Sequence, residues 1–247
     1  MTDSHVHLER GDYTAGWLDR FVSRAVETGV GEVWFLEHSY LFPEFLPMYD
    51  CLKGKSGFVD DWLARKGGKR SLAEYLGFAL ESRRRELPVK VRFGLEVCYF
   101  PGCEDIVRSH SEGFDFLVGS IHFIDGFAFD HIPELWEGVD VDEAYRRYFE
   151  LSIQLAKCQV FDGIAHPDSI KLFGHRPSFP LERYYDRLAS ALAEADMYAE
   201  QNSGISRRTG AEAGMAPGLL SAMKRHGVKL VYASDAHRPE DVGALLI

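Results

Sequence analysis

The amino-acid sequence predicts an α/β fold in which parallel strands form a barrel. Runs of β-branched and aromatic residues alternate with helical patterns along the chain, and this alternation is typical of a parallel sheet. Seven strand-like runs indicate a barrel rather than an open sheet. The length of 247 residues suits one α/β barrel, and no low-complexity segment or long polar linker divides the chain. We therefore expect a single domain over residues 1–247.

The elements can be assigned in order from their residue patterns. A helix is predicted over Ala15–Thr28, where Leu18 and Val22 share one apolar face. It should end at Gly29, because glycine commonly follows the last turn of a helix. The expected strands are Asp3–Leu8, Val30–Leu36, Val89–Phe93, Phe114–Ile121, Phe161–Ala165, Met197–Ala199 and Leu230–Ala233. The other expected helices are Leu72–Arg85, Asp142–Lys157, Leu181–Ala195 and Leu219–Arg225.

One segment interrupts the alternation of strands and helices. Residues Phe42–Gly68 carry two prolines and four glycines, which is typical of a long connection. We expect this insertion to form a wall over a functional site.

Composition and charge exclude several classes of protein. With 28 Lys and Arg against 38 Asp and Glu, the formal net charge is −10, which argues against binding nucleic acid through its phosphates. No apolar run approaches the ~20 residues that a membrane helix needs. The N-terminus has neither the basic start nor the apolar stretch of a secretory signal, so we expect a cytoplasmic protein. The cysteines lack C-x-x-C spacing and are expected to be packing thiols: Cys51, Cys98, Cys103 and Cys158.

Histidines and carboxylates gather where the predicted strands end. Six of the ten histidines lie at these ends, and all carboxyl ends of a parallel barrel open on one face. His5 and His7 alternate along the first strand, so both should point into the barrel. The polar residues at the strand ends are His5, His7, Glu37, His38, Glu96, His122, His166, Asp168, Glu200, Asn202, Asp235 and His237.

Such a set of side chains predicts a metal centre. Imidazole nitrogen and carboxylate oxygen are the donors that divalent transition metals take, and a carboxylate can bridge two ions. The alternative is a group of hydrogen-bonded core histidines, which is the commoner reading of a single histidine. Six histidines with Glu96 and Asp235 favour metal binding, because burying so many ionisable groups is costly without a compensating charge.

The motifs that carry these residues resemble those of a known family. They are HxH at His5 and His7, EH at Glu37 and His38, GLE at Glu96, GSIH at His122, AHPD at His166, and SDAH at Asp235 and His237. In this combination and order the chain resembles the polymerase and histidinol phosphatase (PHP) superfamily over almost its whole length. The resemblance implies a distorted (β/α)7 TIM-like barrel with a trinuclear metal site.

The resemblance also implies ligand sets for two or three divalent ions of zinc, iron or manganese. The first ion would take His5, His7, Glu96 and Asp235, and the second would take Glu96, His122 and His166. The third would take His38 and His237. Many members have a further histidine where this sequence has Tyr13, so Asp12 or Glu9 would have to substitute, and we expect Asp12.

Within the superfamily, the sequence is most similar to the stand-alone histidinol-phosphate phosphatases. Basic residues near the strand ends could bind phosphate, since guanidinium groups grip phosphate oxygens in pairs. Arg207 matches a phosphate-side arginine of the family and is the preferred candidate. The other candidates for substrate binding, some of which could equally be solvated loop residues, are Lys171, His175, Arg176, Asn202 and Arg208.

The implied reaction is hydrolysis of L-histidinol phosphate by a hydroxide that bridges two ions. The expected partner is a small phosphorylated substrate, with neither nucleic acid nor a membrane. Glu96, Asp235 and His237 would be catalytic, and His237 or a metal-bound water would be the general acid. Asp130 and His131 could meet the amino or imidazole end of the substrate, although a structural role is the commoner reading of such a pair.

Three alternatives stay open. They are another PHP phosphoesterase acting on nucleotides or phosphotyrosine, an amidohydrolase-like hydrolase, and a noncatalytic metal-stabilised module. The oligomeric state cannot be read from the sequence.

Overall fold

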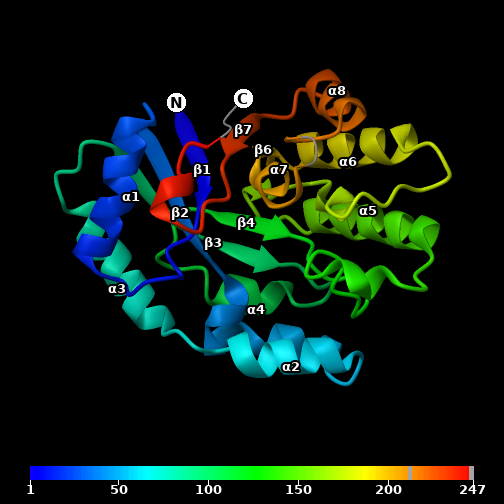
Figure 1. The fold of residues 1–247 in the computed structure, drawn as a ribbon, viewed down its shortest axis with the longest axis horizontal. Coiled ribbons are helices and arrows are strands. Elements are labelled where there is room, and N and C mark those ends of the chain that lie inside the picture. The colour runs from blue at the N-terminus through cyan, green and yellow to red at the C-terminus, as the bar shows by residue number, and fades with distance from the viewer. Residues whose placement is uncertain (211–212, 245–247) are drawn as a thin grey trace.

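A computed structural model describes residues 1–210 and 213–244 of the chain. Seven parallel strands form one sheet in which chain order and spatial order agree (Figure 1). The strands are β1 (Thr2–Val6), β2 (Glu32–His38), β3 (Lys90–Cys98), β4 (Leu117–Ser120), β5 (Gly163–Ile164), β6 (Tyr198–Asn202) and β7 (Leu230–Ala233). The predicted α/β architecture with seven parallel strands is confirmed.

The first and last strands meet and bring the sheet close to a closed barrel. The His7 amide donates to the Ala236 carbonyl at 2.8 Å, and Val6 forms a parallel bridge with Ala236. The carboxylate of Asp3 accepts from the Ser234 amide at 2.9 Å. These contacts place the ends of β1 and β7 side by side, although more than two hundred residues separate them in the chain.

Helices cover the outside of the barrel. In Figure 1, α5, α6 and α8 lie along one flank, and α1 and α3 lie along the other. Side-chain oxygens cap several helices, and Thr14 accepts from the Trp17 amide at the start of α1. The helices are α1 (Ala15–Glu27), α2 (Gly57–Lys66), α3 (Leu72–Arg83), α4 (Glu104–Ser109), α5 (Val141–Lys157), α6 (Glu182–Glu194), α7 (Gly204–Thr209) and α8 (Pro217–Arg225). Among the described residues, no helix is long and apolar enough to cross a membrane.

Alternation along the strands divides the side chains into two sets. Phe35 and Phe93 belong to the large core between the sheet and the helices, whereas Trp34, Leu36 and Phe116 belong to a smaller cluster that fills the barrel interior. Toward the carboxyl ends of the strands, the inward-facing side chains change from apolar residues to histidines and carboxylates. The apolar layer therefore forms the floor beneath the polar strand ends.

The structure differs from the sequence prediction in short elements. Strand β5 has only two residues, and the chain leaves the sheet before His166, whose backbone adopts φ 30°. Helices α4 and α7 have six residues each, which is too few for a helical period to be recognised. The Phe42–Gly68 insertion contains the 3-10 segment Pro43–Leu52 and helix α2.

Candidate metal centre

The barrel interior brings the predicted strand-end residues together. His38 at the end of β2 is the register partner of Glu96 in β3, so their side chains leave neighbouring strands on the same side. Within residues 1–210 and 213–244, four groups of three side chains have ligand atoms within 4.8 Å of one another. They are His5, His7 and Asp235; His7, His38 and Glu96; His7, Glu9 and His237; and Glu96, His122 and His166.

His5 in β1 and His7, just after the end of that strand, point at one place. Their Nε2 atoms lie 2.9 Å apart, and Asp235 Oδ1 lies 3.7 Å from each. Glu96 Oε2 completes the group at 3.4 Å from His5 and 3.5 Å from His7. Both imidazoles are fully buried. Four donor atoms facing a common point inside the protein fit one divalent ion.

Glu96 lies at the middle of the whole constellation. Its Oε1 is 2.9 Å from His122 Nε2 and 3.0 Å from His166 Nε2, whereas its Oε2 is 3.2 Å from His38 Nε2. Burial opposes ionisation of Glu96, but the surrounding imidazoles outweigh it and hold the pKa of this carboxyl well below its usual range. Glu96 is therefore a carboxylate whose two oxygens face two different sets of histidines, as a bridging ligand requires.

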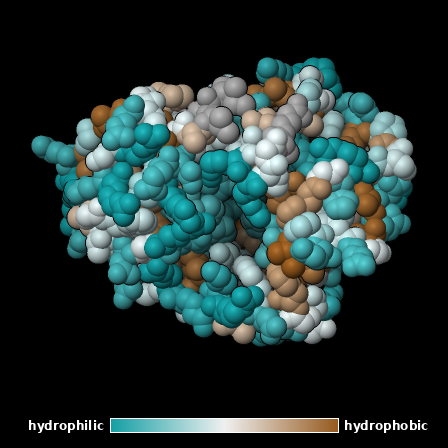
Figure 2. All heavy atoms as spheres, in the orientation of Figure 1, coloured by the Kyte–Doolittle hydropathy of each residue, from teal (hydrophilic) through white to brown (hydrophobic). Residues whose placement is uncertain are grey.

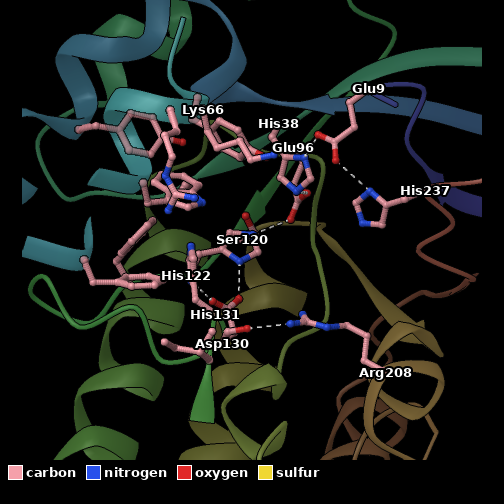
Figure 3. Close-up of a pocket in the computed structure, with 18 of the residues that line it drawn as sticks. Glu9, His38, Lys66, Glu96, Ser120, His122, Asp130, His131, Arg208 and His237 are labelled. Atoms are coloured by element: carbon pink, nitrogen blue, oxygen red, sulfur yellow. Dashed lines mark hydrogen bonds and ion pairs between the residues drawn. The ribbon is translucent and has the colours of Figure 1, made fainter. Parts of the chain in front are cut away.

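The remaining group corrects one expectation from the sequence. Glu9 Oε2 lies 3.0 Å from His38 Nδ1, and Glu9 Oε1 lies 3.1 Å from His237 Nδ1 (Figure 3). The side chain of Asp12 is 91% exposed and faces Arg70, so the structure places it outside the centre. Asp12 stands two residues before the Thr14 cap of α1, where the chain has already turned toward solvent.

Tyr13, which occupies the position of a family histidine, also turns away from the centre. Its ring packs on Tyr75 and Phe78 at centroid distances of 5.2 and 5.7 Å. Glu9 is thus the residue of this loop that reaches the histidines. Burial opposes ionisation of Glu9, but His38 and His237 outweigh it and hold the pKa of this carboxyl well below its usual range.

A second layer of carboxylates holds the imidazoles in place. Glu200 Oε1 accepts from His5 Nδ1 at 2.8 Å, and its Oε2 accepts from the His166 amide at 3.2 Å. Asp130 accepts from His122 Nδ1 at 2.6 Å. Carboxylates behind metal-binding histidines fix ring orientation and increase ligand basicity. Sequence reasoning did not assign Glu200 a role, although its position on the interior side of β6 is the signal that could have found it.

A chamber of about 580 Å³ opens above Glu96. A smaller cavity of about 80 Å³ lies among His38, Glu96, His166 and Asp235. Aromatic rings from the insertion, Phe58 and Trp62, line the chamber, so the expected wall over the site is present. Figure 2 shows a hollow on this face of the molecule that hydrophilic residues largely surround.

The expected phosphate-binding residues lie in different places. Arg208 lines both cavities, and its Nη2 donates to the Asp130 carbonyl at 3.0 Å (Figure 3). Arg207 instead donates to the Ser234 carbonyl and, at 2.7 Å, to the Asp235 carbonyl. The preference for Arg207 over Arg208 is therefore reversed by the geometry, since Arg207 supports the backbone of Asp235 from behind.

The other four candidates serve the scaffold. Lys171 is buried, and its Nζ donates to Asp168 at 2.8 Å and to the Gly214 carbonyl at 2.5 Å. The His175 ring stacks on Trp136 at 4.2 Å. Arg176 donates to the His175 carbonyl at 2.8 Å, and Asn202 donates to Glu200 at 3.1 Å. None of these four lines the two cavities, because their polar groups are used within the loops that carry them.

With this geometry established, comparison with known proteins identifies the family. The sequence matches the PHP domain over residues 3–204, which is most of the chain. The chain belongs to the PHP domain family. A relative of this PHP domain in Deinococcus radiodurans, named "Probable histidinol-phosphatase", is 29% identical over 253 residues, which cover 98% of this chain and 88% of the relative.

Two solved structures share the fold of this PHP domain. A crystal structure from Listeria monocytogenes, named "putative histidinol phosphatase hisK", has a TM-score of 0.75 at 18% identity and covers 99% of this chain and 98% of its own. A histidinol phosphate phosphatase of Lactococcus lactis was solved in complex with zinc, L-histidinol and phosphate. It has a TM-score of 0.63 at 20% identity, and the match covers 96% of this chain and 86% of the Lactococcus lactis chain.

Two candidate ligands of the PHP domain have unusual backbone conformations. His166 has φ 30° and Asp235 has φ 56°, and residues other than glycine rarely adopt positive φ. Such strain persists only where the surrounding structure imposes it, and it is concentrated at functional sites. At Asp235 the constraint includes Gly204, because a Cβ on Gly204 would lie 2.5 Å from Asp235 Oδ2.

Proposed function

We propose that this PHP domain is a metal-dependent phosphomonoesterase that hydrolyses L-histidinol phosphate to L-histidinol and phosphate. The observation that carries the proposal is Glu96, a buried carboxylate that faces two sets of imidazoles at the floor of a chamber. The names of the relatives support the substrate, and the Lactococcus lactis protein binds zinc, L-histidinol and phosphate.

We propose two or three divalent ions of zinc, iron or manganese. The ligands of the first would be His5, His7, Glu96 and Asp235, and those of the second would be Glu96, His122 and His166. The third would use His38, His237 and Glu9 in place of Asp12. When bound, such ions supply a deprotonated water as nucleophile and positive charge for the phosphoryl oxygens.

Protein side chains would orient the substrate in the chamber. Arg208 is the cation that reaches both cavities, so we propose that its guanidinium binds the equatorial phosphoryl oxygens. Asp130 accepts from His122 and from His131 Nδ1 at 2.8 Å, so its carboxylate holds two imidazoles rather than a substrate amine. Both nitrogens of His237 face carboxylates, Glu9 at 3.1 Å and Asp235 at 3.5 Å. This position favours a ligand role for His237 over proton donation to the leaving group.

The test combines metal content with phosphate release. Purified wild-type protein is expected to hold two or three divalent ions per chain and to release phosphate from histidinol phosphate. Glu96→Ala is expected to lose bound metal and at least about a thousandfold in kcat/KM, because two ions would share this ligand. Glu81→Ala, a change of the same type on the exposed face of α3, serves as the control.

Two results would overturn the proposal. One is metal-loaded wild-type protein that releases no phosphate from histidinol phosphate. The other is full activity in Glu96→Ala.

A further inference from the structure

We infer that the chamber contains a second anion-binding subsite, and that the enzyme therefore also hydrolyses aromatic phosphomonoesters that carry a second anionic group. The inference rests on the proposed phosphomonoesterase activity and extends its substrate class. It is carried by three cations that line the outer chamber and that the phosphoryl site does not need.

The cations of the chamber fall into two sets. Arg208 lines both the outer chamber and the small cavity among the candidate metal ligands. Arg10, Arg65 and Lys66 line the outer chamber but not the small cavity. Arg208 is thus placed to bind the transferring phosphoryl group, and the other three cations are placed to bind a second group in the outer chamber. Figure 3 shows Lys66 apart from Arg208, whose guanidinium is directed toward Asp130.

The acidic side chains of the chamber do not neutralise this outer set. Among the described residues, the acids that line the chamber are Glu9, Glu96 and Asp130. Each has imidazole partners: Glu9 contacts His38 and His237, whereas Asp130 contacts His122 and His131. No ion pair of Arg10, Arg65 or Lys66 with a carboxylate occurs within the described part of the chain, although Arg65 Nε donates to the Asp61 carbonyl of its own helix at 3.2 Å. The outer chamber is therefore locally positive in a protein with net charge −10.

Helical spacing explains why two of these cations border the chamber. Phe58, Trp62, Arg65 and Lys66 occupy positions i, i+4, i+7 and i+8 of α2 and therefore share one side of the helix, where the two rings are partly buried and the two cations are exposed. All four line the chamber. The same face thus offers rings that can pack on an aromatic substrate and cations that can bind an anion beside them.

This combination defines a substrate class. The substrate would place its phosphoryl group at Arg208, its ring along Phe58 and Trp62, and a carboxylate or second phosphate at Lys66 and its neighbours. Histidinol phosphate carries an imidazole ring and an ammonium but no second anionic group, so it leaves the outer cations without a partner. In the reaction the P–O ester bond breaks, water supplies the new oxygen on phosphorus, and a proton of that water passes to the leaving oxygen. Nothing is oxidised or reduced.

A matched pair of esters tests the second subsite. O-phosphotyrosine and tyramine phosphate share ring, ester and amine and differ in one carboxylate. We expect kcat/KM to be about tenfold higher for O-phosphotyrosine, which is the effect of one charge-assisted contact. In the double variant Arg65→Gln and Lys66→Gln, this ratio should fall toward one.

The control is a double variant with the same change of charge outside the chamber. Lys69→Gln with Arg84→Gln removes two exposed cations that do not line the cavity, so the ratio should stay near the wild-type value. Basic residues in the last turn of α2 also interact with the helix dipole. If that were their only role, melting temperature would change in the variant and the substrate ratio would not.

Binding supplies a readout that does not depend on turnover. 4-(Phosphonomethyl)phenylalanine and its decarboxylated analogue cannot be hydrolysed, and calorimetry should show about tenfold tighter binding of the carboxylate form. Equal binding of the two phosphonates, or a ratio unchanged by Arg65→Gln with Lys66→Gln, overturns the inference. If the subsite test fails but the protein still hydrolyses histidinol phosphate, the proposed function remains intact. If histidinol phosphate is not hydrolysed, the proposed function fails, whatever the subsite test shows.

Discussion

The guanidinium of Arg70 donates from Nη2 to the backbone carbonyl of Glu9 at 2.8 Å, and the same nitrogen reaches the Gly11 carbonyl at 2.8 Å. Arg70 lies just after the insertion, and its own amide donates to the Leu41 carbonyl at 2.9 Å. One side chain thus joins the chamber wall to the loop that carries Glu9 between His38 and His237. The wall and the candidate third metal site are therefore mechanically connected.

Replacing Arg70 should loosen the Glu9 loop. Arg70→Ala removes two charge-assisted hydrogen bonds, so we expect a loss of about 2 kcal/mol in the free energy of unfolding and about tenfold weaker binding of one metal ion. Metal content after gel filtration, together with denaturant unfolding, measures both. Arg84→Ala, at an exposed position after α3, should change neither. Unchanged metal retention in Arg70→Ala would show that Glu9 holds its position without this contact.

Much of the centre could be predicted because strand geometry decides it. The carboxyl ends of parallel strands share one face, and residues two apart share one side of a strand, so His5, His7 and Glu96 had to converge. The fold followed from the same regularity. No comparable rule governs the loops beyond the strand ends.

The loop residues show where prediction from sequence fails. Glu9 and Asp12 are both carboxylates near the same motif, and only the turn at Gly11 decides which one faces the histidines. Arg207 and Arg208 are neighbours in α7, and successive residues of a helix point about 100° apart. One therefore supports Asp235 and the other lines the chamber, a distinction that depends on how the short helix packs.

Gly204 should be essential for the position of Asp235. An alanine Cβ at this place would lie 2.5 Å from Asp235 Oδ2 and 2.7 Å from Asp235 Cβ, closer than real contacts allow. Gly204→Ala should displace the carboxylate and weaken binding at the His5 and His7 group by about ten- to a hundredfold. Metal titration of the chelator-treated protein measures this. Gly16→Ala in α1, where nothing lies within 4 Å, should leave binding unchanged.

Glu200 should control the orientation of His5. Glu200→Ala removes the acceptor at 2.8 Å from His5 Nδ1 and also leaves the His166 amide without its partner. We expect about ten- to a hundredfold weaker metal binding, as is typical when a carboxylate behind a histidine ligand is lost. Glu200→Gln keeps an acceptor oxygen and should lose less. Equal losses in the two variants would mean that the charge of Glu200, rather than its hydrogen bonds, supports the centre.

Metal binding should release protons and strengthen with pH. In the metal-free protein, burial opposes the charged form of His122, but Asp130 and Glu96 outweigh it and raise its pKa to about 10. Hydrogen bonds to Asp235 and Glu9 likewise overcome burial and raise the pKa of His237 to about 9. These raised pKa values predict that both imidazoles are protonated at neutral pH, so that a metal ion must displace a proton from each that it binds.

The increase of metal affinity with pH can be measured directly. Each released proton should increase metal affinity about tenfold per pH unit below pH 9, and calorimetry in buffers of different ionisation enthalpy counts those protons. Because their pKa values are raised, the protonated imidazoles of His122 and His237 stabilise the metal-free fold. This stabilisation is complete below about pH 6.5 and is lost as pH rises through 9 and 10. Metal-free protein should thus melt at lower temperature as pH rises over this range, while metal affinity increases. Equal metal affinity at pH 7 and pH 8 would show that these imidazoles are already neutral before the ions bind.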